Sequence, residues 1–187
     1  LAFVAMTRLA PTESGQHDQV AVVGFHDRAW IAQPLGNDPA RIALALRRLP
    51  DGIAQGTRLD LAFAGGVQAL ETGWRRPDNQ GVLILLTDGL PNRVPPAEDG
   101  TMETTVRRAA QAAKDAGIRV YTIGVGSTEP SADILDRVDA RLLTDCASRA
   151  DMFFHQPSAE QLSGVYRQII WTFDPCSGRH RWGVPWP

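Results

Sequence analysis

Residues 81–89 read GVLILLTDG, a continuous hydrophobic run that ends abruptly at Thr87, Asp88 and Gly89. A strand at the centre of a parallel sheet is buried on both faces, so its sequence lacks the alternation of a half-exposed strand. A change to turn-forming residues directly after such a run marks the end of the strand. The run therefore predicts a central parallel strand with Asp88 at its carboxyl end.

Strand and helix patterns alternate on both sides of this run. We predict further strands over residues 19–25, 29–32, 118–125 and 152–155. We predict helices over residues 38–49, 57–72, 101–116, 133–147 and 158–171. Helices between strands form crossovers within a parallel sheet, whereas the short turn at residues 26–28 predicts an antiparallel hairpin. The pattern indicates an α/β fold of three layers, with helices on both faces of a doubly wound, mainly parallel sheet that has one antiparallel edge strand.

Residues at the predicted helix ends support these boundaries. Asp38 followed by Pro39 is typical of a helix start, with Asp as the N-cap and Pro in the first helical position. Gly117 is the expected left-handed cap at the end of the helix over residues 101–116. Ser158 and Gln161 have the spacing of a capping box before the last helix.

The composition is that of one ordinary globular domain. The chain has 187 residues, of which 43% are hydrophobic and 21% charged, and its net charge is −2. Its arginines are scattered, so we expect no nucleic-acid partner, which would require a concentrated basic face. No run approaches the roughly 18 apolar residues of a membrane span, and we find no dinucleotide loop, P-loop, nucleophile elbow or zinc-protease motif. These absences argue against an enzyme and against membrane insertion within this chain.

The two ends of the chain differ from its middle. Residues 1–10 are apolar at helical spacing, as at the end of an amphipathic helix whose beginning is missing, so the chain reads as a fragment. Residues 179–187 have no periodicity. We therefore expect an N-terminally truncated domain over residues 1–172, followed by a tail or linker over residues 173–187.

Cys146 and Cys176 are the only cysteines, and their spacing fits neither a zinc site nor a redox motif. A disulfide between them would imply an oxidising compartment. Two buried free thiols are the alternative, and the bridge is only slightly favoured.

Thr57 and Asp88 are the polar residues that the pattern places where an open α/β sheet binds ligands, beyond the carboxyl ends of its strands. Each also has a structural interpretation. Thr57 with Asp60 three residues later is close to a capping box, and the pair Asp88 and Gly89 is a turn signal. Taken singly, the structural interpretation is favoured for both residues.

Three segments together resemble successive landmarks of the von Willebrand factor A (VWA) domain family. They are the run at residues 20–25 with Asp27, the Gly-Thr-x-Leu-x-x-Ala sequence at residues 56–62, and the Leu-Leu-Thr-Asp-Gly-x-Pro-Asn sequence at residues 85–92. Residues 118–126 also resemble the family's fifth strand. Each motif is weak alone but specific as an ordered set, and the resemblance extends from residue 1 to about residue 170.

The resemblance implies a non-enzymatic protein-binding or adhesion module with a Rossmann-like VWA fold. Members of this kind hold a divalent cation, usually Mg²⁺, through an Asp-x-Ser-x-Ser loop, a Thr that matches Thr57 and an Asp that matches Asp88. The cation then captures an acidic side chain of a protein ligand. An alternative is a structural or assembly domain of a larger bacterial envelope or secretion protein with a vestigial metal site. An extracytoplasmic or cell-surface location is expected, although a cytoplasmic one is compatible with the sequence.

The chain departs from the family pattern in one respect. It contains no Asp-x-Ser-x-Ser loop, because the family's first strand would precede Leu1. That strand is central in the family's sheet, between the strand at Val20 and the strand at Leu83. Without it both inner edges are exposed, so we expect an isolated chain of low stability unless these two strands pair directly.

Overall fold

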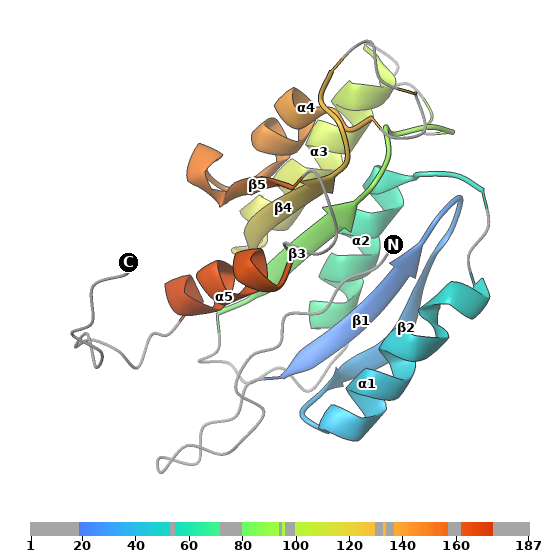
Figure 1. Cartoon of the computed structure of the whole chain (residues 1–187), viewed down its shortest axis with the longest axis vertical. Coiled ribbons are helices and arrows are strands. Elements are labelled where there is room, and N and C mark those ends of the chain that lie inside the picture. The colour runs from blue at the N-terminus through green and yellow to red at the C-terminus, as the bar shows by residue number, and fades with distance from the viewer. Residues whose placement is uncertain are drawn as a thin grey trace.

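The computed structural model describes residues 19–52, 55–71, 80–93, 95, 100–129, 133, 137–156 and 162–173. Several predictions fall outside these ranges: the helix end at residues 1–10, the tail after residue 173, Cys176, and the capping box of Ser158 and Gln161. Within the described residues the fold is α/β, as predicted from the sequence (Figure 1).

The predicted hairpin and the helix that follows it are present. Strand β1 (Val20–Phe25) pairs antiparallel with β2 (Ala29–Gly36), which is longer than expected. Helix α1 (Pro39–Arg48) has Asp38 as its N-cap, whose side chain accepts hydrogen bonds from the backbone N–H groups of Ala40 and Arg41. This confirms the start predicted from Asp38 and Pro39, and a short 3₁₀ helix, η1 (Leu49–Gly52), completes the segment.

The rest of the chain alternates between helices and parallel strands. Its elements are α2 (Leu59–Glu71), β3 (Val82–Thr87), α3 (Met102–Asp115), β4 (Arg119–Val125), α4 (Ala140–Cys146), η3 (Ala150–Met152), β5 (Phe153–Gln156) and α5 (Leu162–Phe173). The three strands form one parallel sheet in the order β3-β4-β5. Gly117 has a φ of +74°, as the predicted left-handed cap requires.

Helices cover both faces of the strands. One buried cluster joins α2, α3 and α4 to β1, β3 and β4, and includes Leu59, Phe63, Val106 and Leu142. On the opposite face, α1 packs on β1 through Ile42 and Val22, and α5 packs on β3, β4 and β5. The described helices and strands therefore form the three layers expected from the sequence (Figure 1).

The strands do not form one continuous sheet. Strand β1 pairs only with β2, and β3 only with β4, among the residues that the structure describes. Figure 1 shows β1 and β3 side by side, pointing in the same direction, with α2 packed across both. A Cβ at Gly65 would lie 3.0 Å from Val23 of β1, and one at Gly66 would lie 2.4 Å from Leu83 of β3. Helix α2 thus contacts both sheets closely, and direct pairing of β1 with β3 does not occur among the described residues.

The prediction for α4 was wrong at its start. A helix was expected from residue 133, but α4 begins at Ala140, where the side chain of Asp139 accepts a hydrogen bond from the N–H of Leu142. Just before this cap, the N–H of Val138 donates to the carbonyl of Ser127, and Arg137 forms an isolated bridge with Ser127. These contacts hold residues 137–138 against the end of β4, so α4 begins only after them.

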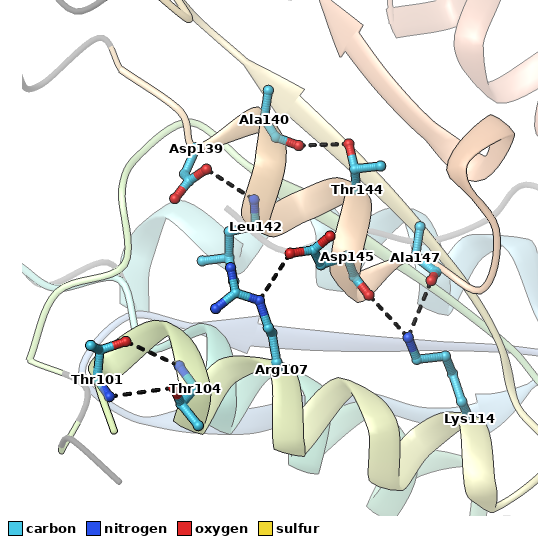
Figure 2. A network of polar contacts seen from close by, with 10 residues as sticks. All are labelled: Thr101, Thr104, Arg107, Lys114, Asp139, Ala140, Leu142, Thr144, Asp145 and Ala147. Atoms are coloured by element: carbon cyan, nitrogen blue, oxygen red, sulfur yellow. Dashed lines mark hydrogen bonds and ion pairs between the residues drawn. The ribbon is translucent and has the colours of Figure 1, made fainter. Parts of the chain in front are cut away.

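A polar network joins α3 to α4 (Figure 2). Arg107 Nε donates to Asp145 Oδ2 over 3.0 Å. Lys114, the only lysine of the chain, donates from Nζ to the carbonyls of Asp145 and Ala147 over 3.1 and 3.2 Å. A cation suits these carbonyls because the carboxyl end of a helix carries unpaired acceptors and a partial negative charge.

We expect Lys114→Met to lower the free energy of unfolding by about 1–2 kcal/mol, because two carbonyls at the end of α4 lose a charged donor. The measurement is urea unfolding followed by circular dichroism. Arg141→Met is the matched control, since Arg141 is exposed on α4, and it should change the same free energy by less than about 0.5 kcal/mol. Equal effects of the two variants would show that the Lys114 contacts do not stabilise the fold.

Cys146 is a buried free thiol. The slightly favoured bridge involves Cys176, which lies outside the described residues. Burial raises the pKa of the Cys146 thiol from 9.0 to about 12, so the group stays protonated and unreactive at neutral pH.

Candidate functional site

The carboxyl ends of β1 and β3 meet the loop that leads into α2. Asp27 follows β1, Asp88 and Gly89 follow β3, and residues 55–58 precede α2. This edge is where the sequence placed a ligand site, and we call it the carboxyl edge. Asp88 is exposed and Thr57 is half-buried.

Two loops are held together by a clasp between Thr57 and Asn92. The backbone N–H of Thr57 donates to Asn92 Oδ1 over 3.0 Å, and the N–H of Asn92 donates to the carbonyl of Thr57 over 3.1 Å. Asn92 Nδ2 also donates to Thr57 Oγ1 over 3.4 Å. Both groups of the Asn92 amide are used, so the loop after β3 is fixed against the loop before α2.

The clasp brings Thr57 to the turn that follows Asp88. A Cβ at Gly89 would lie 3.5 Å from Thr57 Oγ1, so the Thr57 hydroxyl contacts the turn that follows Asp88. Thr57 does not cap α2, because the first helical hydrogen bond runs from the N–H of Ala62 to the carbonyl of Arg58. The structural interpretation of Thr57 as an N-cap is therefore wrong, and its hydroxyl lies among side chains of the carboxyl edge.

Arg58 and Asp60 form a pair beneath this loop. Arg58 Nε and Nη2 donate to the two carboxylate oxygens of Asp60 over 2.8 and 2.6 Å, and Asp60 is only 8% exposed. The hydrogen bond to Asp60 raises the pKa of the Arg58 guanidinium, which therefore stays charged. The N–H of Arg58 also donates to the carbonyl of His26 over 2.8 Å. Residue 58 thus joins the start of α2 to the end of β1.

Asp27 lies beside the same loop. Its Oδ1 is buried without a hydrogen-bond partner and faces His26 Nδ1, while its Oδ2 is 3.8 Å from Arg93 Nη1. Gly56 has a φ of +130°, and a Cβ there would lie 3.1 Å from both the N and the Cβ of Asp27. Glycine is needed at residue 56 for both its conformation and this close approach.

The candidate ligands at the carboxyl edge are of the type that a hard divalent cation prefers, but they are too few to hold it alone. The Thr57 hydroxyl and the Asp88 carboxylate are oxygen ligands of the type that Mg²⁺ prefers. Among the described residues, however, no group of three or more His, Cys, Asp or Glu side chains is placed to hold a metal. A cation bound here would therefore take most of its remaining ligands from water or from a partner.

The structural roles of two residues at the carboxyl edge were not predicted from the sequence. The sequence drew attention to Asn92 and Asp27 only as landmarks, yet Asn92 forms the clasp and Asp27 packs against Gly56. The Pro-Asn pair that follows the turn of Asp88 and Gly89 was the available signal, but its partner lies 35 residues away in the sequence. Nothing in the sequence pointed to a role for Arg58 except its position next to Thr57.

We compared the chain with known protein families and structures to find which family it belongs to. The model of the von Willebrand factor type A domain matches residues 5–168. The chain belongs to the VWA domain family. Among curated protein sequences, none matches the chain. VWA domains are generally adhesion or protein-interaction modules.

Solved structures share the VWA fold at low sequence identity. The vWF domain of the type V pilus tip protein Mfa5 from Porphyromonas gingivalis is 13% identical, with a TM-score of 0.68 over 95% of this chain and 86% of that one. The pilus adhesin SpaC from Lactobacillus rhamnosus GG is 17% identical, with a TM-score of 0.64 over 81% of this chain and 25% of that one. These identities establish the fold and nothing beyond it.

Proximal thread matrix protein 1 from the mussel byssus is 22% identical, with a TM-score of 0.57 over 82% of this chain. The matched region is only 34% of the mussel protein, so this VWA chain spans about a third of that relative. Another structure of the mussel protein has zinc in its MIDAS motif. No helix among the described residues of our chain has the length and apolar character needed to cross a membrane.

Proposed function

We propose that this VWA chain is a non-enzymatic protein-binding module whose carboxyl edge holds a divalent cation through Thr57 and Asp88. The observation that carries the proposal is the clasp, because it fixes the Thr57 hydroxyl against the turn that follows Asp88. This contact between two loops distant in sequence supports a site at which the Thr57 hydroxyl and the Asp88 carboxylate would act together. Mg²⁺ is the cation that we assign, with other divalent cations such as Mn²⁺ as substitutes.

The partner in this proposal is a protein with an exposed acidic side chain. Mg²⁺ has a near-octahedral set of oxygen ligands and usually retains several waters. Thr57 and Asp88 supply few of these ligands and only one negative charge, so the cation stays electropositive and accessible. A carboxylate of the partner can replace a water there, which gives recognition that depends on the cation. We further propose an extracytoplasmic or cell-surface location, as for the pilus proteins of similar fold.

The first test uses the metal alone. Addition of Mn²⁺ should broaden the amide NMR signals of Thr57, Gly89 and their neighbours before any others, because the ion is paramagnetic. We expect Asp88→Ala to weaken Mn²⁺ binding by at least about tenfold, which is about 1.4 kcal/mol, without a change in the circular dichroism spectrum. The matched control is Asp115→Ala at the end of α3, an exposed carboxylate that should not affect binding.

A different function is favoured if Mn²⁺ broadens no signals at this edge. Since the described residues include no cluster of three or more metal-ligating side chains, the chain would then be a structural or assembly domain with a vestigial site. Equal binding by Asp88→Ala and Asp115→Ala would contradict the cation proposal in the same way.

A further inference from the structure

A pocket lies at the amino ends of β4 and β5, at the opposite end of the parallel sheet from the carboxyl edge. Its wall includes Arg119 and Tyr121 of β4, Phe154 of β5, and Lys114 near the end of α3. The pocket has a volume of about 510 Å³, within the roughly 300–1,000 Å³ that small-molecule sites occupy. It shares no lining residue with the carboxyl edge, so its ligand would be separate from the proposed cation.

The charged side chains that line this pocket are Lys114, Arg119, Arg149 and Asp151. Arg149 and Asp151 neutralise each other, because Nε and Nη2 of Arg149 donate to the two carboxylate oxygens over 2.9 and 2.5 Å. The described lining contains no second carboxylate to neutralise Lys114 and Arg119. Their two positive charges therefore favour an anion in the pocket.

Three groups in the pocket retain hydrogen-bond donors. An ammonium has three N–H donors, and Lys114 uses two of them on carbonyls at the end of α4, so its third is available (Figure 2). Among the described residues, no hydrogen bond or ion pair occupies the half-buried Arg119 guanidinium. Ser148 Oγ accepts from the N–H of Val120 over 2.9 Å, which leaves the hydroxyl hydrogen to donate. Charged donors of these kinds bind carboxylate and phosphate groups strongly.

The rest of the pocket wall is mainly apolar and aromatic. Tyr121 and Met152 are buried in the cluster beneath α5, and Phe154 packs against that cluster while remaining half-buried. Arg119 and Tyr121 are two residues apart on β4, so their side chains lie on the same face of the sheet. A ligand whose anionic group meets Arg119 can therefore place an adjoining ring against Phe154.

We propose that this pocket binds a small organic anion, in which a carboxylate or phosphate group is attached to an apolar ring. Arg119, the third N–H of Lys114 and the Ser148 hydroxyl hold the anionic group, and the ring packs against Phe154. The guanidinium is the principal contact, because it can donate two parallel hydrogen bonds to one anionic group. This recognition uses no group of the carboxyl edge, so it goes beyond the proposed function and does not depend on it.

The test is an NMR titration of the full chain, in EDTA, with phenyl phosphate and separately with benzoate. EDTA removes divalent cations, which would otherwise draw either anion to the carboxyl edge. We expect saturable shifts of the amide signals of residues 118–121 and 148–154, and none at Thr57 or Gly89. Benzyl alcohol has the ring without the charge and should cause no saturable shift. The anion that binds more tightly shows whether the pocket prefers phosphate or carboxylate.

Two substitutions should change this binding in opposite directions. Arg119→Met removes the principal donor and should weaken binding of the tighter anion by at least about tenfold. Asp151→Asn releases the Arg149 guanidinium from its bidentate pair and should strengthen the same binding severalfold. Arg48→Met is the matched control, since Arg48 is exposed on α1, and it should leave binding unchanged. Circular dichroism checks that each variant folds, and if Arg119→Met does not, the effect of Asp151→Asn decides the question.

Several results would overturn the proposal. One is the absence of saturable shifts at residues 118–121 and 148–154 with both anions, and another is equal binding of benzyl alcohol. Shifts spread over many arginines would show unspecific binding of anions to the surface. Binding that neither Arg119→Met nor Asp151→Asn alters would place the anion elsewhere. These results do not bear on Mn²⁺ binding, so this proposal can fail while the proposed function stands.

Discussion

We expect Phe63→Ala to lower the free energy of unfolding by about 3–5 kcal/mol. Phe63 is 0% exposed and belongs to the buried cluster that joins α2 to strands of both sheets. Removal of its ring leaves a cavity at α2, a helix that contacts both β1 and β3. Domains of this size are stable by only about 5–15 kcal/mol, so the loss is a large fraction of the total.

The measurement is urea unfolding at 25 °C, with circular dichroism and tryptophan fluorescence as separate probes. Leu44→Ala is the control, because Leu44 is 47% exposed on α1 and should change the free energy by less than about 0.5 kcal/mol. Similar losses for the two variants would mean that α2 is not the main connection between the sheets. If the two probes unfold Phe63→Ala at different urea concentrations, the sheets have separated into independent units.

Arg58→Met should lower the free energy of unfolding by about 3 kcal/mol, the lower end of the range for breaking a buried ion pair. Methionine preserves much of the volume of the arginine stem but leaves the Asp60 carboxylate without its bidentate partner. Asp60 lies in the first turn of α2, where the positive end of the helix dipole partly compensates for the lost charge. This is why we place the expected loss no higher.

A double variant separates the lost pair from the lost packing. Arg58→Met with Asp60→Leu removes both charges, and replacement of a whole buried pair by apolar residues is often neutral or stabilising. We expect its free energy of unfolding to return to within about 1 kcal/mol of the parent value. A double variant as unstable as Arg58→Met alone would show that the arginine stem, not the unpaired carboxylate, is what matters.

Local patterns predicted the elements of this VWA chain well. The continuous apolar run at residues 81–86 predicted a strand, and β3 forms there, although among the described residues it lies at the edge of its sheet with Val82 and Ile84 only partly buried. Asp38 and Gly117 marked helix ends by their own chemistry. The start of α4 was missed because residues 137–138 read as helical but bond to Ser127 near the end of β4. A contact between distant segments overrode the local preference there.

At the carboxyl edge, too, the sequence predicted local positions but not the contacts between distant segments. The positions of Thr57 and Asp88 at this edge followed from the general geometry of open α/β sheets. The approach of Thr57 to the turn after Asp88 depends on Asn92, whose side-chain oxygen and nitrogen both bond to Thr57, and no sequence period encodes such a contact. The unpaired edges of β1 and β3 were predicted only through the family resemblance, since each strand alone reads as an ordinary hydrophobic run.

The division of the sheet has a mechanical consequence. In a continuous sheet, tension across the strands is shared by every backbone hydrogen bond of the ladder. Between β1 and β3 that ladder is absent among the described residues, so a pulling force is carried by the packing of α2 and, at one end, by the Thr57–Asn92 clasp. Packing contacts weaken within a fraction of an ångström of separation. The part of the chain that the structure describes would therefore yield first along this line, opening from the end opposite the clasp.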